Sequence, residues 1–140
     1  MIDKGYAEGL LGGETRCAVI KGDKKFTSTK RGIAPLIELA GSGEDYSGGF
    51  AADRKVGKAA ALIYAHVGIR TLYAAVLSKA ALSVLDRYGI EYAYGTLAEY
   101  IINRSGDGLC PMEQTVRNID DPDEALIKLQ ETVQRLQAKA

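Results

Sequence analysis

The sequence has few of the residues that disulfide frameworks, metal centres and charged surfaces require. Its 140 residues include two cysteines and one histidine, and the formal net charge is zero. Because Cys17 and Cys110 lie far apart in a chain that is 46% hydrophobic, we expect reduced thiols rather than a disulfide scaffold. A zero net charge does not indicate a protein that binds nucleic acid or an anionic membrane through an excess of basic residues. A neutral total still leaves room for a local basic pocket.

Long hydrophobic runs are also absent. The longest, residues 59–65, is far shorter than the roughly 20 residues that span a bilayer. The N-terminal residues carry no signal-peptide pattern, so we expect a cytoplasmic protein that does not contact the membrane. A chain of 140 residues is the size of one domain, and no linker or repeat divides it. Residues 1–140 are therefore expected to form a single domain.

Short apolar runs alternate with helical segments along most of the chain. The first two runs flank a turn that contains Gly22 and predict a β-hairpin. Alternation of strands and helices after the hairpin favours βαβ units. Strands are predicted at 17–20, 25–27, 49–52, 71–77 and 90–94, and helices at 33–39, 56–67, 80–88 and 97–102.

We therefore predict an α/β domain with a mixed, mostly parallel sheet of about five strands covered by helices on both faces. Extra C-terminal helices are expected over residues 110–138, one beginning at Pro111 and one near Asp121. Residues 1–14 are rich in glycine and weakly patterned, so they form either a short helix or a loose N-terminal arm.

Two nucleotide-binding motifs are missing. Gly57-Lys58 lacks both the earlier glycine of a phosphate-binding loop and the hydroxyl residue that follows its lysine. No Gly-rich dinucleotide fingerprint follows any predicted strand. These absences argue against a P-loop nucleoside triphosphatase and a Rossmann dinucleotide-binding protein.

Residues 50–63 resemble a segment of the zinc-dependent nucleoside and base deaminases. In those enzymes a strand leads into a Pro-Cys-x-x-Cys helix start, the helix is Ala-rich, and another strand follows. Here Lys55 and Lys58 stand near the two cysteine positions, and residues 30–33 replace the earlier His/Cys-Ala-Glu motif. Lysine and arginine cannot ligate zinc, and His66 cannot form a site alone. The resemblance therefore implies a deaminase-like protein without a metal or another cofactor.

Three separated segments carry a more specific resemblance, namely residues 28–36, 52–61 and 102–113. In this order they are similar to the domain of unknown function 1893 family, over about residues 15–135. The resemblance implies a three-layer α/β/α, cytidine-deaminase-like fold. It implies no activity.

A cationic pocket is expected where zinc sits in the deaminases. Two helix N-termini would converge there, each with free N–H groups and a partial positive charge. Arg31 and Lys58 would then bind a phosphorylated or nucleotide-like small molecule, while Lys30 and Lys55 are expected to face water. Asp53 would orient Lys58, bind a ligand hydroxyl, or cap the helix.

Cys110 is a candidate nucleophile, because a cysteine at a helix start near basic residues can have a lowered pKa. A buried packing role is the alternative. Glu113 would serve as acid or base, or as the capping partner of its own helix. The loop with Asn103 and Arg104 would bring Cys110 to the pocket, and both residues are expected to contact the ligand.

Three functions remain open from the sequence. One is a non-zinc hydrolase or transferase that uses Cys110, Lys58 and Glu113 on a phosphorylated substrate. The second is a non-catalytic module that senses a nucleotide-like anion. The third, a zinc deaminase with unusual ligands, is the least favoured. Ala-rich and Leu-rich helices also leave open a homo-oligomer that pairs through an apolar face.

Overall fold

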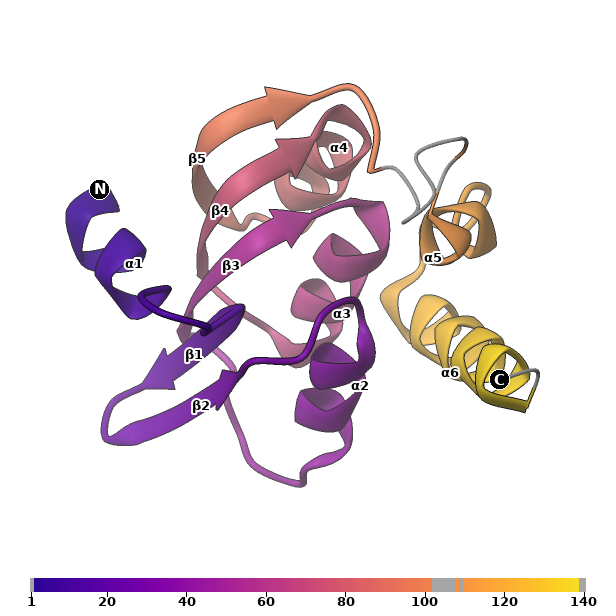
Figure 1. Ribbon diagram of the computed structural model, residues 1–140, viewed down its shortest axis with the longest axis horizontal. Coiled ribbons are helices and arrows are strands. Elements are labelled where there is room, and N and C mark those ends of the chain that lie inside the picture. Colours follow the sequence, from indigo (N-terminus) through magenta and orange to yellow (C-terminus); the bar gives the residue numbers. More distant parts are fainter. Residues whose placement is uncertain (1, 102–107, 109, 139–140) are drawn as a thin grey trace.

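The computed structural model describes residues 2–101, 108 and 110–138. Five strands form one sheet in the order β2-β1-β3-β4-β5 (Figure 1). β1 pairs antiparallel with both neighbours, and β3, β4 and β5 run parallel. The prediction of a mixed five-stranded α/β sheet is confirmed, but two of the four described strand pairings are antiparallel, so the sheet is partly and not mostly parallel. The strands are β1 (Cys17–Lys21), β2 (Lys24–Ser28), β3 (Phe50–Val56), β4 (Thr71–Ser78) and β5 (Glu91–Ala98).

Helices are distributed unevenly around this sheet. In Figure 1, α2, α3 and α4 lie along one face, α5 and α6 lie outside α3, and α1 lies on the opposite side. Among the described residues, α1 is the helix that packs on this second face, against β3 and β4. The helices are α1 (Lys4–Leu10), α2 (Ala34–Gly41), α3 (Lys58–Val67), α4 (Lys79–Arg87), α5 (Pro111–Thr115) and α6 (Pro122–Ala138).

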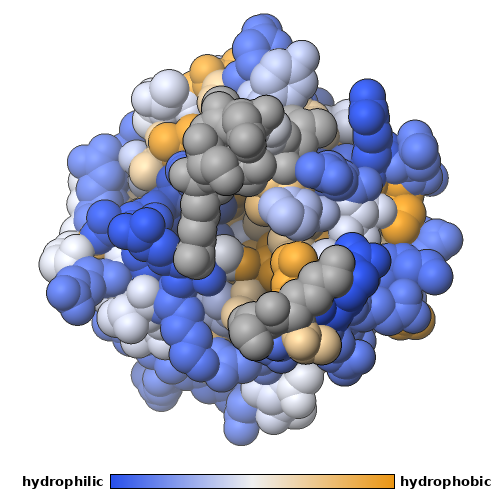
Figure 2. Space-filling model, turned by 45° about the vertical axis from the view of Figure 1, so that its right-hand side comes forward, coloured by the Kyte–Doolittle hydropathy of each residue, from blue (hydrophilic) through white to orange (hydrophobic). Residues whose placement is uncertain are grey.

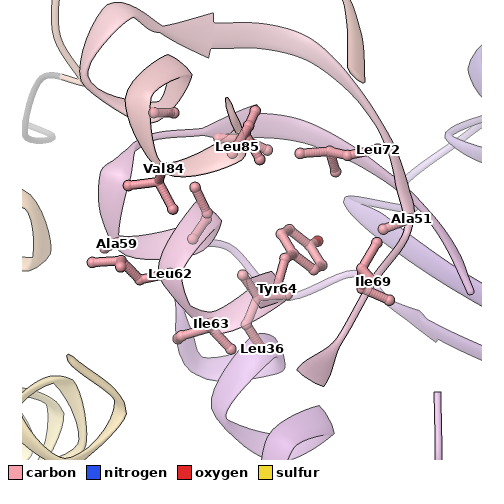
Figure 3. Packing of buried hydrophobic residues seen from close by; sticks show 14 of the residues in the cluster. Leu36, Ala51, Ala59, Leu62, Ile63, Tyr64, Ile69, Leu72, Val84 and Leu85 are labelled. Atoms are coloured by element: carbon pink, nitrogen blue, oxygen red, sulfur yellow. The ribbon is translucent and has the colours of Figure 1, made fainter. Parts of the chain in front are cut away.

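α3 is the central helix of the main core. Six consecutive residues, 59–64, are buried, because the helix is covered by the sheet on one side and by α2, α4 and α6 on the others. Figure 3 shows the Tyr64 ring among core side chains of α2, α4, β3 and β4. The helix ends at Gly68, whose φ of 89° is the left-handed conformation that favours glycine.

The N-terminal segment is a helix rather than a loose arm. Asp3 caps α1 by accepting a hydrogen bond from the backbone N–H of Tyr6 at 3.0 Å, and Ala7 and Leu11 pack in a second buried cluster with Tyr73. The C-terminal end of the segment is held by one side chain. The Arg54 guanidinium donates at 2.7 Å to three backbone carbonyls, those of Leu11, Gly13 and Thr15.

The helix predicted at 97–102 is wrong over its described part. Leu97 and Ala98 belong to β5, where they pair with Leu77 and Ser78 of β4. Leu97 also packs against the main core, so tertiary packing outweighs the local helical pattern. Residue 102 lies outside the described residues.

The surface near α5 and α6 is predominantly hydrophilic, with hydrophobic colour confined to small areas (Figure 2). None of the helices in the described residues combines the length and the apolar character needed to cross a membrane.

Candidate functional site

The N-terminus of α3 lies at the carboxyl end of β3, where Val56 leads through Gly57 directly into the helix. Gly57 occupies the N-cap position and offers no side chain to the first turn. The first backbone N–H groups of a helix have no partners within it and carry a partial positive charge. An acceptor from elsewhere must therefore satisfy them.

Glu113 of α5 supplies that acceptor. One carboxylate oxygen accepts from the backbone N–H of Lys58 at 2.8 Å, and the other accepts from the N–H of Ala59 at 2.8 Å. The two bonds join residues more than fifty positions apart in the chain. A carboxylate held by two N–H groups at a helix N-terminus has the arrangement of a bound oxyanion.

Gly57 makes this approach sterically feasible. A Cβ at this position would lie 2.8 Å from Oε2 of Glu113 and closer still to the rest of the carboxylate. The backbone there is extended, with φ −100° and ψ −170°, so the conformation itself does not require glycine. The space occupied by Glu113 is what excludes a larger residue.

The Lys58 side chain is also held by the segment that follows α5. Its Nζ donates to the carbonyl of Arg117 at 3.2 Å and lies 3.1 Å from Oδ1 of Asp120. The side chain is only 13% exposed. Asp120 therefore orients Lys58, which was one of the three roles considered for Asp53.

Cys110 stands at the start of α5 and is half-buried. Pro111 occupies the first turn, as predicted, but the thiol makes no cap hydrogen bond. The backbone N–H of Cys110 donates to the carbonyl of Ile101 at 3.0 Å, so Glu113 does not close a capping box on its own helix. That alternative for Glu113 is wrong, because its carboxylate caps α3 instead.

Asp53 is buried beneath α3, at 9% exposure. Its carboxylate accepts from the Tyr64 hydroxyl at 2.7 Å and from the backbone N–H of Lys55 at 3.3 Å. Burial raises its pKa to about 7, although the bond from Tyr64 opposes this shift. Cys17, its neighbour on β1, has a pKa raised to about 12, mainly by burial. The helix-cap role for Asp53 is wrong, since α3 begins at Lys58, five residues later, and Gly57 occupies its N-cap position.

The other predicted site residues are dispersed. Arg31 is exposed in the segment before α2, and the described contacts do not connect it with Lys58 or Glu113. Lys30 forms an exposed ion pair with Glu38 at 3.2 Å. Asn103 and Arg104 lie outside the described residues. Of the predicted site, the structure thus brings together Lys58 and Glu113, with Cys110 at the start of the same short helix.

A buried hydroxyl lies at the same edge of the sheet. Ser78 ends β4, one residue after Leu77, which pairs with Val56 just before Gly57. The side chain is 1% exposed, and its Oγ has no hydrogen-bond partner in the described part of the chain. Buried hydroxyls are usually satisfied, so an unsatisfied one marks a position where a polar group could bind. Among the described residues, no three His, Cys, Asp or Glu side chains gather as a metal centre would require.

Comparison with known proteins gives a family and a fold. Residues 7–133 match the family model described as TM1506, domain of unknown function (DUF1893). The crystal structure of a DUF1893 family protein, TM1506 from Thermotoga maritima, is similar to this chain with a TM-score of 0.83 and 24% sequence identity. The similarity covers 94% of this chain and 92% of that chain. No curated protein matches.

Proposed function

The chain belongs to the TM1506 family of unknown function (DUF1893), and we propose that it binds a phosphorylated or nucleotide-like small molecule at the N-terminus of α3. The observation that carries the proposal is the carboxylate of Glu113, bound by the backbone N–H groups of Lys58 and Ala59. The chain's own carboxylate takes the place of the ligand's oxyanion. In the free protein it acts as an internal competitor.

The site offers more donors than a capping carboxylate needs, and this suits a phosphate group. A phosphate would be a stronger acceptor for the two N–H groups than the carboxylate is. The Lys58 ammonium, which is held by Arg117 and Asp120, would add a cation to the site once those contacts open. The unsatisfied hydroxyl of Ser78 lies at the same edge of the sheet and would bind another polar group of the ligand.

Ligand binding would move α5. Glu113 must leave before a phosphate can reach the N–H groups, and α5 is bonded to α6 through the hydroxyls of Thr115 and Thr132 at 2.8 Å. The same displacement would strain the bonds from Lys58 to Arg117 and Asp120. Coupling of this kind fits a non-catalytic ligand-sensing module, with the α5–α6 segment as the responding element.

Catalysis through Cys110 is the second candidate. The thiol is half-buried at the start of α5, three residues before Glu113, and it does not cap the helix. Release of Glu113 would free a carboxylate to act as acid or base beside the thiol. This version makes the chain a hydrolase or transferase that works without a metal, and Cys110→Ser would abolish turnover but leave binding intact.

A cytidine-deaminase-like origin of the fold is part of the same proposal. Its support is the order of elements. The hairpin β1–β2 precedes α2, and β3 leads without a loop into the Ala-rich α3, which is followed by β4. The deaminase segment described above has the same order of strand, Ala-rich helix and strand. The α3 N-terminus would then correspond to the metal site, with Lys58 in place of a zinc ligand.

A thermal-shift experiment tests the proposal. Inorganic phosphate, adenosine monophosphate and ribose 5-phosphate would be added to the wild type, Lys58→Ala, Glu113→Gln and Lys79→Ala. Lys79 is the matched control, because it opens α4 at the end of β4 but pairs with Glu99. A ligand at a hundredfold excess over its dissociation constant stabilises the fold by about 2.7 kcal/mol.

We expect a phosphorylated probe to stabilise the wild type and Lys79→Ala, to fail with Lys58→Ala, and to bind Glu113→Gln more tightly. The tighter binding follows because glutamine keeps the shape of the side chain but removes the competing charge. If no probe stabilises either the wild type or Glu113→Gln, Glu113 is a structural cap and the proposal is wrong.

A further inference from the structure

The three parallel strands share an irregularity near their carboxyl ends. On β4, Ala74 packs in the main core and Ala75 against the α1 cluster, Val76 lines a groove beside Ala75, and Leu77 returns to the main core. Two consecutive residues therefore face the α1 side, where regular alternation would allow one. In the described strands, Ala75 has no Cα pairing partner on either side. The pairing of β4 with β3 and with β5 stops at Ala74 and resumes at Val76.

Gly95 of β5 accommodates the irregularity. A Cβ there would lie 2.9 Å from the carbonyl oxygen of Ala75 and 3.3 Å from the hydroxyl of Tyr73. The same displacement on β3 turns both Arg54 and Lys55 toward the α1 side, where they line the groove together. The strands thus open a hollow that a regularly alternating sheet would lack.

This hollow is an open groove of about 390 Å³ between α1 and the carboxyl ends of β3 and β4. Its floor is mostly apolar and its rim is mostly cationic. The apolar residues are Leu11, Ala75 and Val76, and Tyr73 adds an aromatic ring. The charged residues that line it are Glu8, Arg16, Arg54 and Lys55.

The four charged side chains differ in the contacts that they make. Glu8 accepts a hydrogen bond from the Tyr73 hydroxyl at 3.3 Å. Arg54 is fixed by three backbone carbonyls, which are neutral, so its positive charge is not cancelled. Arg16 is half-buried and Lys55 exposed, and in the described part of the chain neither side chain has a hydrogen-bond or ion-pair partner. Arg16 also interacts electrostatically with the buried Asp53, whose pKa it lowers. Among the side chains that line the groove, three cations against one carboxylate still leave a positive excess.

We propose that this groove is a second binding site, specific for a small organic anion with one carboxylate or phosphate group and a compact apolar body. Arg16 and Lys55 bind the oxyanion, with the fixed charge of Arg54 beside them. Leu11, Tyr73 and Val76 contact the apolar body. The volume suits a small metabolite, since ligand pockets typically begin near 300 Å³. The site lies on the opposite face of the sheet from α3 and does not depend on the function proposed there.

Benzoate, phenyl phosphate and inorganic phosphate are suitable probes, because they separate the contribution of the ring from that of the charge. Isothermal titration would compare the wild type with Arg16→Gln, Lys55→Met and the control Lys25→Met. Lys25 is an exposed lysine of β2, away from the groove. The same variants would be followed by thermal unfolding, so that loss of binding is distinguished from loss of the fold.

We expect phenyl phosphate or benzoate to bind more tightly than inorganic phosphate. Arg16→Gln and Lys55→Met should each weaken the binding by about tenfold, the effect of losing one charge-assisted contact, and Lys25→Met should not. Equal affinity in all four folded proteins, or no binding of either aromatic probe to the wild type, would overturn the proposal. Binding that is lost in Lys58→Ala but kept in Arg16→Gln would assign the probe to α3 and overturn it as well.

Discussion

Gly57 and Glu113 fit each other at the start of α3. The carboxylate of Glu113 occupies the space into which a Cβ of residue 57 would project, and from there it accepts hydrogen bonds from the next two backbone N–H groups. A residue without a side chain is therefore required by a contact with a distant helix. The backbone conformation at Gly57 is one that any residue adopts.

Gly57→Ala should destabilise the protein by about 1–3 kcal/mol, the usual effect of leaving buried hydrogen-bonding groups unsatisfied. In an open position of compatible conformation, the same substitution would stabilise the fold by about 0.4–1 kcal/mol. The sign of the change in unfolding free energy, measured by urea denaturation, thus reports on Glu113.

A double-mutant cycle provides the control. Once Glu113→Ala has removed the carboxylate, the added Gly57→Ala has nothing to displace and should cost little. The two changes are then strongly non-additive. Additive losses would mean that Gly57 matters for a reason other than Glu113.

Asp53 should make stability depend on pH. Its pKa is about 7 in the folded protein because of burial, and an unfolded aspartate has a pKa of about 3.9. Between these values the folded state binds a proton that the unfolded state has lost, so the unfolding free energy should fall as the pH rises from about 4 to about 7 and then level off. Asp53→Asn keeps an acceptor for Tyr64 and should remove this slope.

Asp45→Asn is the matched control for that experiment. Asp45 is exposed, and hydrogen bonds from Ser47, with a contribution from Lys21, hold its pKa well below the usual range. Its contribution to stability is therefore present above pH 4 and is lost only as the pH falls further. The wild type and Asp45→Asn should show the same slope between about pH 4 and 7. An unchanged slope in Asp53→Asn would show that Asp53 titrates normally.

Arg54 should hold α1 against the sheet. Arg54→Met removes the three donors to the carbonyls of the α1 end but keeps most of the aliphatic stem. Amide hydrogen exchange should become faster in residues 4–10 and stay slow in residues 58–67, because local opening of α1 does not require the main core to open. Arg70→Met, at an exposed arginine before β4, is the control. Equal acceleration of both segments would show that Arg54 supports the whole fold.

The strands and the central helix follow from local patterns that the sequence displays. The apolar run of β4 and the Ala-rich α3 with its terminal glycine are features of single segments. The positions of α1 and of Leu97 do not follow from the pattern of a single segment. α1 depends on the contacts of Arg54 with distant carbonyls, and Leu97 joins β5 because it packs in a core that the local pattern does not reveal.

The candidate site shows the same limit. The sequence predicted both Lys58 and Glu113 as site residues. It did not predict the hydrogen bond from the backbone N–H of Lys58 to the carboxylate of Glu113. One signal was available: the N-cap position of α3 holds Gly57 and not a Ser, Thr, Asp or Asn, so the first N–H groups of the helix needed an external acceptor. The choice of Glu113 depends on how α5 packs, which no local pattern records. The helix-cap role suggested for Asp53 failed because β3 continues past it to Val56.

The amide signals of Lys58 and Ala59 test the central claim most directly. In a two-dimensional ¹⁵N–¹H spectrum of the uniformly labelled wild type, these two N–H groups report on the acceptor that they contact. We predict that adenosine monophosphate shifts both signals in a saturable manner, at lower concentration in Glu113→Gln than in the wild type, while the Arg70 amide stays in place. If both signals stay unmoved in both proteins at concentrations that saturate any other site, the N-terminus of α3 binds no ligand and Glu113 is simply its cap.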